Sequence, residues 1–128
     1  MKFQIHKLIK TVNLLVLLEL FFSSCKHKTE FQNIPEVKYS TDIAPIISSN
    51  CTFSGCHGSA STESFDLLSY EHVIAAGIKS GKPNTSKLYQ SLKSYNTEKM
   101  MPKKPYNYLT EKQIQLIYLW IGQGAKNN

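Results

Sequence analysis

Two cysteines and a histidine lie close together near the middle of this chain, at Cys51, Cys56 and His57. Two thiols followed at once by an imidazole are typical of C-x-x-C-H, the string that attaches haem c. Its cysteines form thioethers with the haem vinyl groups, and its histidine binds the iron. Here four residues separate the cysteines instead of two. Taken alone, this wider spacing also fits a small disulfide loop or half of a zinc site.

The number of cysteines narrows these alternatives. The chain has one more, Cys25, at the end of an apolar N-terminal segment, and exported proteins usually pair their cysteines. If Cys25 carries lipid, either two thioethers to haem or one disulfide would use both remaining thiols. A structural zinc site needs four ligands, and the chain contains no second pair of closely spaced cysteines. Haem and a disulfide therefore stay open, whereas zinc is disfavoured.

The N-terminal segment predicts export. Three lysines precede an apolar run over residues 12–22, and small residues then lead to Cys25, which is the order found in a signal peptide. The run is shorter than the roughly 20 apolar residues of a transmembrane helix, and Glu19 within it argues against residence in lipid. We expect residues 1–24 to be a signal peptide.

The residues Phe-Ser-Ser-Cys at 22–25 resemble a bacterial lipobox, in which the cysteine is acylated and becomes the mature N-terminus. We therefore expect lipid on Cys25, a polar tether over residues 25–38, and a periplasmic or outer-membrane lipoprotein. Ordinary signal cleavage near Ser24 is the alternative. The remaining residues 39–128 are enough for one compact domain.

The basic residues of the chain indicate which classes of partner to expect. The formal net charge is +6, and all of the basic residues are lysines. Without arginine the chain lacks the side chain that most often reads bases through paired hydrogen bonds, so nucleic-acid binding is not expected. A mild lysine excess suits either a solvated surface or weak docking to an acidic protein partner.

Apolar residues at helical spacing predict an all-α domain without strands. One short helix should end near Asn50, directly before Cys51, and the clearest helix begins at Thr110, where Gln113 completes a capping box. Two shorter helices are expected between them, over residues 70–76 and 85–93. The candidate N-caps are Ser40, Thr41 or Asp42 for the first helix, Ser69 for the second and Thr110 for the last.

A haem that exchanges electrons needs a second axial ligand besides a histidine, and methionine is one choice. Met100 and Met101 stand together in a proline-bearing stretch, residues 95–108, that has no helical pattern. A long irregular loop in a small domain is often functional. His72 is the other candidate ligand. Simple core packing of the methionines is the alternative to ligation.

Several short strings share their order and spacing with a known family: Asp42-Ile43-x-Pro45-Ile46, Cys56-His57-Gly58, Leu67-x-x-Tyr70, Ser86-x-Leu88-Tyr89, Met101-Pro102, Leu109-Thr110 and Trp120-Ile121-x-x-Gly124-Ala125. Together they resemble the planctomycete-type cytochrome c domains of exported bacterial proteins, over the chain from about Tyr39 to Asn128. Some members of that family have the wider cysteine spacing found here.

The resemblance implies a fold like that of class I cytochromes c, with about three to five short helices around one covalent haem c. It implies that Cys51 and Cys56 are the attachment residues, His57 the proximal ligand and Met101, directly before Pro102, the distal ligand. Met100 and His72 are the alternatives for the distal position. An apolar shell would surround the haem, and its candidates are Ile43, Ile47, Leu88, Leu92, Ile117 and Trp120.

Three functions follow as hypotheses. The first is a membrane-tethered monohaem c-type cytochrome, which carries single electrons between a redox partner, such as an exported dehydrogenase or respiratory complex, and a later acceptor without being an enzyme. The second is a haem sensor or haem enzyme with a labile sixth ligand. The third is an exported binding module without a cofactor, in which a disulfide joins Cys51 and Cys56.

Overall fold

The computed structural model describes residue 31, residues 33–59 and residues 65–128, and within them the chain is helical without any strand. The described residues form four α-helices, which are α2 (Ala44–Asn50), α3 (Tyr70–Ala75), α4 (Lys87–Leu92) and α5 (Glu111–Gly122). A π-helical turn, η1 (Tyr39–Ile43), precedes α2, and a 3-10 turn, η2 (Pro83–Thr85), precedes α4. The expectation of an all-α domain is therefore confirmed for the described residues. None of these helices has the length and apolar character needed to cross a bilayer.

The first helix begins differently from the sequence prediction. Its N-cap is Lys38, whose backbone N–H donates a hydrogen bond of 2.7 Å to the Asp42 carboxylate. The prediction that Ser40, Thr41 or Asp42 is the N-cap is wrong, because the π-helical turn starts at Tyr39 and takes all three residues into the helix. Asp42 still acts near the helix start, where a negative charge is favourable. The predicted end near Asn50 is confirmed.

The second predicted cap is confirmed. The Ser69 hydroxyl accepts a hydrogen bond of 3.2 Å from the His72 backbone N–H at the start of α3. Gly77, just beyond the end of this helix, has a φ of +97°, a conformation that favours glycine. Helix α3 therefore begins and ends for the reasons that its sequence suggests.

Helix α4 is shorter than the predicted segment 85–93, because Thr85 belongs to the separate turn η2. Ser86, between η2 and α4, is fully buried. Its hydroxyl accepts a hydrogen bond of 2.8 Å from the Lys79 N–H and donates one of 3.0 Å to the Lys82 carbonyl. These bonds satisfy a buried polar group and fix where α4 starts.

The C-terminal helix α5 forms the centre of the core. The predicted capping box is present, since the Thr110 side chain accepts from the Gln113 N–H while the Gln113 side chain accepts from the Thr110 N–H. The helix packs against η1, η2 and α4. Its Trp120 ring lies 5.5 Å from the ring of Tyr39 and 6.5 Å from that of Tyr70. These rings join the beginning of the domain, α3 and the C-terminal helix in one cluster.

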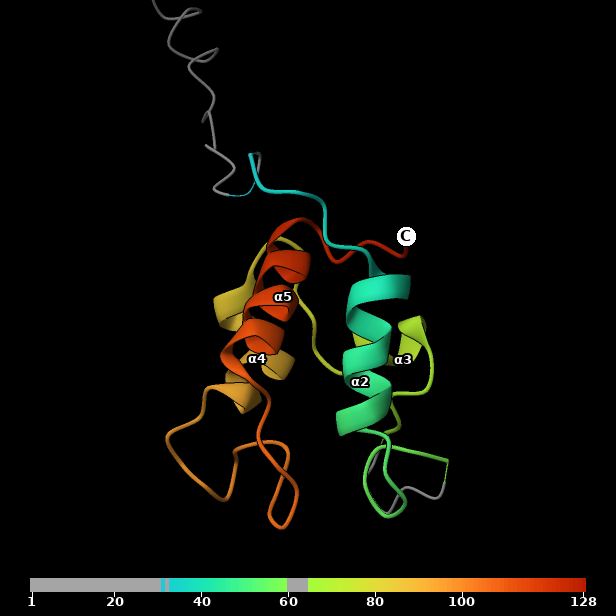
Figure 1. Cartoon of the computed structure of the whole chain (residues 1–128), viewed down its shortest axis with the longest axis vertical. Coiled ribbons are helices and arrows are strands. Elements are labelled where there is room, and N and C mark those ends of the chain that lie inside the picture. Colours follow the sequence, from blue (N-terminus) through green and yellow to red (C-terminus); the bar gives the residue numbers. More distant parts are fainter. Residues whose placement is uncertain (1–30, 32, 60–64) are drawn as a thin grey trace, which may run out of the picture.

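The two ends of the domain carry different segments of the chain. Figure 1 shows the C-terminus and the segment before η1 at one end, near the C-terminal end of α5. The loop after α2 and the long loop between α4 and α5 both lie at the other end. The residues suspected of chemistry, at 51–57 and 100–101, are therefore carried by the same end of the fold.

The last part of the predicted tether is attached to the domain. The Gln123 side chain accepts a hydrogen bond of 2.8 Å from the Val37 N–H and donates one of 3.0 Å to the Pro35 carbonyl. Lys126 forms an ion pair of 2.6 Å with Glu36. The end of the predicted tether therefore lies against the domain, because its backbone groups pair with a side chain at the end of α5. Cys25 and the expected signal peptide lie outside the described residues.

Replacing Gln123 with alanine is expected to lower the free energy of unfolding by about 1–3 kcal/mol, because the docked segment loses its backbone hydrogen-bond partners. Urea unfolding of the mature protein measures this change. Gln115→Ala is the matched control, since Gln115 is exposed on the same helix and its replacement should change stability by less than about 0.5 kcal/mol. Equal effects of the two substitutions would contradict the docking.

Candidate functional site

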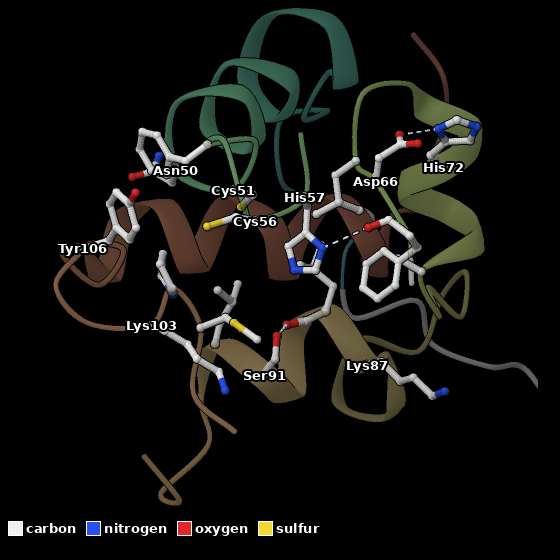
Figure 2. A pocket seen from close by; sticks show the side chains of 18 of the residues that line it. Asn50, Cys51, Cys56, His57, Asp66, His72, Lys87, Ser91, Lys103 and Tyr106 are labelled. Carbon is white, nitrogen blue, oxygen red and sulfur yellow. Dashed lines mark hydrogen bonds and ion pairs between the residues drawn. The ribbon is translucent and has the colours of Figure 1, made fainter. Parts of the chain in front are cut away.

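The loop that holds the two cysteines and the histidine closes on itself through its backbone. The Cys51 N–H donates to the Ile47 carbonyl at 2.9 Å, which ties the loop to the end of α2. The His57 N–H donates to the Cys51 carbonyl at 3.1 Å, and the Cys56 N–H to the Phe53 carbonyl at 2.9 Å. The extra residues between the cysteines therefore form a compact turn, and Cys51 and Cys56 lie close together as a result (Figure 2).

Two glycines permit this turn, as their positions in the sequence suggest. Gly55 has a φ of +78°, which favours glycine over other residues. A Cβ atom on Gly58 would lie 2.4 Å from the Thr52 carbonyl oxygen and 3.2 Å from that of Phe53. The loop can close this tightly only because both positions lack a side chain.

The orientation of His57 is set by a neighbouring backbone carbonyl. Its Nδ1 lies 3.2 Å from the Phe65 carbonyl oxygen, and the Leu67 N–H donates to the His57 carbonyl at 2.8 Å. A carbonyl oxygen only accepts, so Nδ1 carries the hydrogen and the neutral ring keeps its lone pair on Nε2. This arrangement is typical of a histidine that binds a metal through Nε2. The Phe65 ring also stacks on the imidazole, with centroids 4.5 Å apart.

Sequence reasoning missed the part played by Phe65. A backbone carbonyl has no residue-type signature, so nothing in the sequence marks the acceptor for His57. The only signal is indirect: Phe65 opens the segment that leads into α3, and an aromatic residue there can cover an imidazole.

A cavity of about 830 Å³ opens beside this loop, between the cysteine loop and α4 (Figure 2). Its lining includes Cys51, Cys56, His57 and Met101, which are the four haem-binding candidates named from the sequence. The apolar part of the lining comes mainly from Phe53, Phe65, Leu67, Leu88, Leu92 and Tyr106. Three sulfur atoms, an imidazole and an apolar wall thus border one cavity.

Met101 is held in the cavity wall by its backbone. Its N–H donates a hydrogen bond of 3.0 Å to the Ser91 carbonyl in α4, and Figure 2 shows Ser91 across the cavity from Cys51 and Cys56. Met100 is not part of the lining, although the two methionines are adjacent. The structure therefore brings Met101, and not Met100, to the hollow that holds His57.

His72 occupies the outer rim of the same cavity. It lies on α3 with an exposed side chain, and its Nδ1 pairs with the Asp66 carboxylate. Hydrogen bonds from the Leu68 N–H and from His72 hold the pKa of Asp66 below its usual value. His72 is thus oriented by a partner at the surface, away from the two cysteines.

The six candidates for the apolar shell divide between the cavity wall and the core. Leu88 and Leu92 line the cavity. The other candidates, Ile43, Ile47, Ile117 and Trp120, are almost fully buried in the core instead. They lie on the faces of η1, α2 and α5 that pack together, and a helical apolar pattern does not separate core positions from cavity positions.

Burial and, to a lesser extent, the charge of a Cys56 thiolate together raise the pKa of the Cys51 thiol to about 11. Cys51 carries a free thiol in the structure. Because the thiolate is the nucleophile in disulfide exchange and alkylation, this thiol is protected at neutral pH.

In the haem-free chain, Cys51 is expected to react with iodoacetamide at pH 8 about tenfold to a hundredfold more slowly when folded than when unfolded in urea. The raised pKa lowers the thiolate fraction at this pH. The folded rate should therefore keep rising with pH up to about 11, whereas the unfolded rate should level off near the ordinary thiol pKa of 9.0. Mass spectrometry of labelled peptides measures both rates. Equal pH profiles in the two states would contradict the burial of this thiol.

Positive charge also lies at the cavity. Lys87, Lys103 and Lys104 are part of its lining, and the Lys104 ammonium is 4.6 Å from the centre of the Tyr108 ring. Lysines at an apolar hollow suit a ligand that has a large apolar body and negatively charged groups.

The donor set and the hollow fit a haem attached through Cys51 and Cys56. Within the described residues, no three His, Cys, Asp or Glu side chains are grouped closely enough to form a metal site of their own. No protein-family model, curated protein or solved structure matches this chain. The geometry of the cavity is therefore the basis for a functional proposal.

Proposed function

We propose that this chain is an exported, membrane-tethered monohaem c-type cytochrome that carries single electrons. The observation that supports this most is the meeting of Cys51, Cys56, His57 and Met101 at one cavity. They come from two loops that are far apart in sequence. The C-x-x-x-x-C-H string alone also suits a disulfide, but a disulfide explains neither the orientation of His57 nor the presence of Met101.

The size and chemistry of the cavity suit the cofactor. Its volume of about 830 Å³ is within the roughly 300–1,000 Å³ of pockets for organic ligands. Cys51 and Cys56 would hold the haem by thioethers, and His57 Nε2 and Met101 Sδ would bind its iron. The haem supplies one-electron exchange when it is bound.

The other residues of the chain serve to orient these donors and to exclude water. The Phe65 carbonyl keeps the hydrogen of His57 on Nδ1, which leaves Nε2 to the metal. Phe65, Leu67, Leu88 and Leu92 give the hollow an apolar wall. A methionine ligand and an apolar surrounding both favour the reduced, less charged state, so the proposed potential is high for a c-type centre.

The proposal extends to the fold family. A cytochrome c-like arrangement has its first and last helices in contact beside the cofactor. In this chain, α5 packs against η1, and the loop directly after α2 carries Cys51 and His57. These contacts support a class I-like domain.

The test is covalent haem in the mature protein. Made in a host with a cytochrome maturation system, the protein should keep its haem bands in the polypeptide fraction after acid-acetone extraction. Haem that is extracted into the solvent would refute covalent attachment. Carbon monoxide distinguishes the second hypothesis, since a labile sixth ligand lets the reduced spectrum shift at once, whereas a methionine-ligated carrier resists.

A further inference from the structure

The stretch between the two cysteines carries an aromatic residue that reaches the opposite loop. The Phe53 ring stacks on the Tyr106 ring with centroids 4.4 Å apart and an angle of 8° between the planes. Phe53 belongs to the residues that separate Cys51 from Cys56, and Tyr106 belongs to the loop that carries Met101. Both rings line the cavity, and Figure 2 shows Tyr106 on the side where Asn50 and Cys51 lie.

The backbone on each side holds these rings in position. The Phe53 carbonyl accepts the Cys56 N–H at 2.9 Å, which makes Phe53 part of the closed turn between the cysteines. On the other loop, the Tyr106 N–H donates to the Lys103 carbonyl at 3.1 Å. The stack therefore joins two defined turns rather than two loose side chains.

Met101 begins a segment, residues 101–106, that is attached at both ends as a result. At one end of its segment, the Met101 N–H is bonded to the Ser91 carbonyl of α4. At the other end, Tyr106 is stacked on the cysteine loop. A chain segment fixed at both ends has fewer conformations to lose when one of its side chains binds a metal.

We propose that Phe53 and Tyr106 form a clamp that positions Met101, and that the wide spacing of the cysteines provides Phe53 for this purpose. The inference rests on the proposed function, because it concerns the sixth ligand of a bound haem. Phe53 and Tyr106 are positioning residues: they act on the iron through Met101, and only Met101 is assigned as the ligand.

The expected effect follows from the strength of an aromatic pair. Such a pair contributes a stabilisation equivalent to about threefold to tenfold in an equilibrium constant. If the clamp favours the conformation in which Met101 is bound, its loss raises the fraction of molecules with an open sixth position by this factor. Imidazole added to the oxidised protein binds only to the open form, so its apparent affinity should rise equally.

The experiment is imidazole titration of the oxidised, haem-loaded protein, followed by its absorption spectrum. Phe53→Ala and Tyr106→Ala should each raise the imidazole affinity about threefold to tenfold, and the double variant should rise little further, because each single change already removes the stack. Tyr106→Phe keeps the ring and should behave like the parent protein. If the two rings only stabilised the fold, the substitutions would lower the free energy of unfolding. They would not then show the recovery in Tyr106→Phe or the small additional effect of the double variant on imidazole affinity.

The matched control is Tyr108→Ala. Tyr106 and Tyr108 are on the same loop and each is 37% exposed, but it is Tyr106 that stacks on Phe53. Phe53→Leu keeps an apolar side chain of similar size and serves if Phe53→Ala does not fold. The clamp would be overturned if Phe53→Leu and Tyr106→Ala left the imidazole affinity unchanged. It would also be overturned if Tyr108→Ala raised this affinity as much as Tyr106→Ala does. In either case, covalent haem in the parent protein would still support the proposed function. A parent protein without covalent haem would overturn the proposed function, and the clamp with it.

Discussion

Replacing Met101 with alanine is expected to open the sixth position of the haem iron. The reduced variant should bind carbon monoxide at once, and the oxidised variant should bind imidazole at least about a hundredfold more tightly than the parent protein. This factor corresponds to a parent in which the sixth position is open in about 1% of molecules. The reduction potential should fall as well, because the thioether ligand that favours reduced iron is gone.

Met100→Ala is the control for this prediction. The two methionines are adjacent, and Met101 lines the cavity whereas Met100 does not. The Met100 N–H donates to the Asn96 carbonyl at 3.0 Å, so its backbone is held in a different turn. Met100→Ala should leave carbon monoxide and imidazole binding unchanged. The reverse pattern would assign the sixth ligand to Met100.

The second large effect is expected when the two cysteines of the loop are replaced. Replacing both Cys51 and Cys56 with serine should abolish haem that survives acid-acetone extraction, because serine forms no thioether. Each single substitution should lower the yield of holoprotein strongly and leave any remaining haem attached by one bond. The measurement is the ratio of haem absorbance to protein in the extracted polypeptide.

Cys25→Ser separates attachment of haem from attachment of lipid. Cys25 lies outside the described residues, and the proposal gives it lipid rather than haem. The Cys25→Ser variant should therefore retain covalent haem in full while it moves from the membrane fraction to the soluble one. Loss of haem in this variant would contradict the assignment of the three cysteines.

The elements of the fold that depend on local chemistry could be predicted from the sequence. The capping box of Thr110 and Gln113 and the Ser69 cap involve residues three positions apart, and both are present. The end of α2 at Asn50 and the irregular stretch between Leu92 and Glu111 also follow from local patterns. Such features need only neighbouring residues, so a sequence contains most of what determines them.

Features that depend on distant partners could not be predicted. Gln123 pairs with the segment before η1, and the Phe65 carbonyl orients His57. A polar stretch such as residues 33–38 has no apolar period, so nothing in it indicates that its backbone groups meet the end of α5. The contact between Phe53 and Tyr106 could not be predicted either, because each aromatic residue by itself resembles an ordinary loop residue.

The sequence also could not show which apolar residues lie in the core and which line the cavity. Leu92 and Ile117 both have the spacing of buried helical positions, but only Leu92 reaches the cavity. The difference arises from how α4 and α5 are placed relative to the cysteine loop. This placement is a tertiary property, which a helical period does not contain.

The most direct test of the central claim is the intact mass of the mature protein together with its reduced-minus-oxidised absorption spectrum. The account predicts a mass increased by one whole haem, since each thiol adds across a vinyl group without losing an atom, and a reduced spectrum of the c type. A mass only two hydrogens below that of the fully reduced chain, with no haem bands, would contradict it. That result would instead identify the disulfide form.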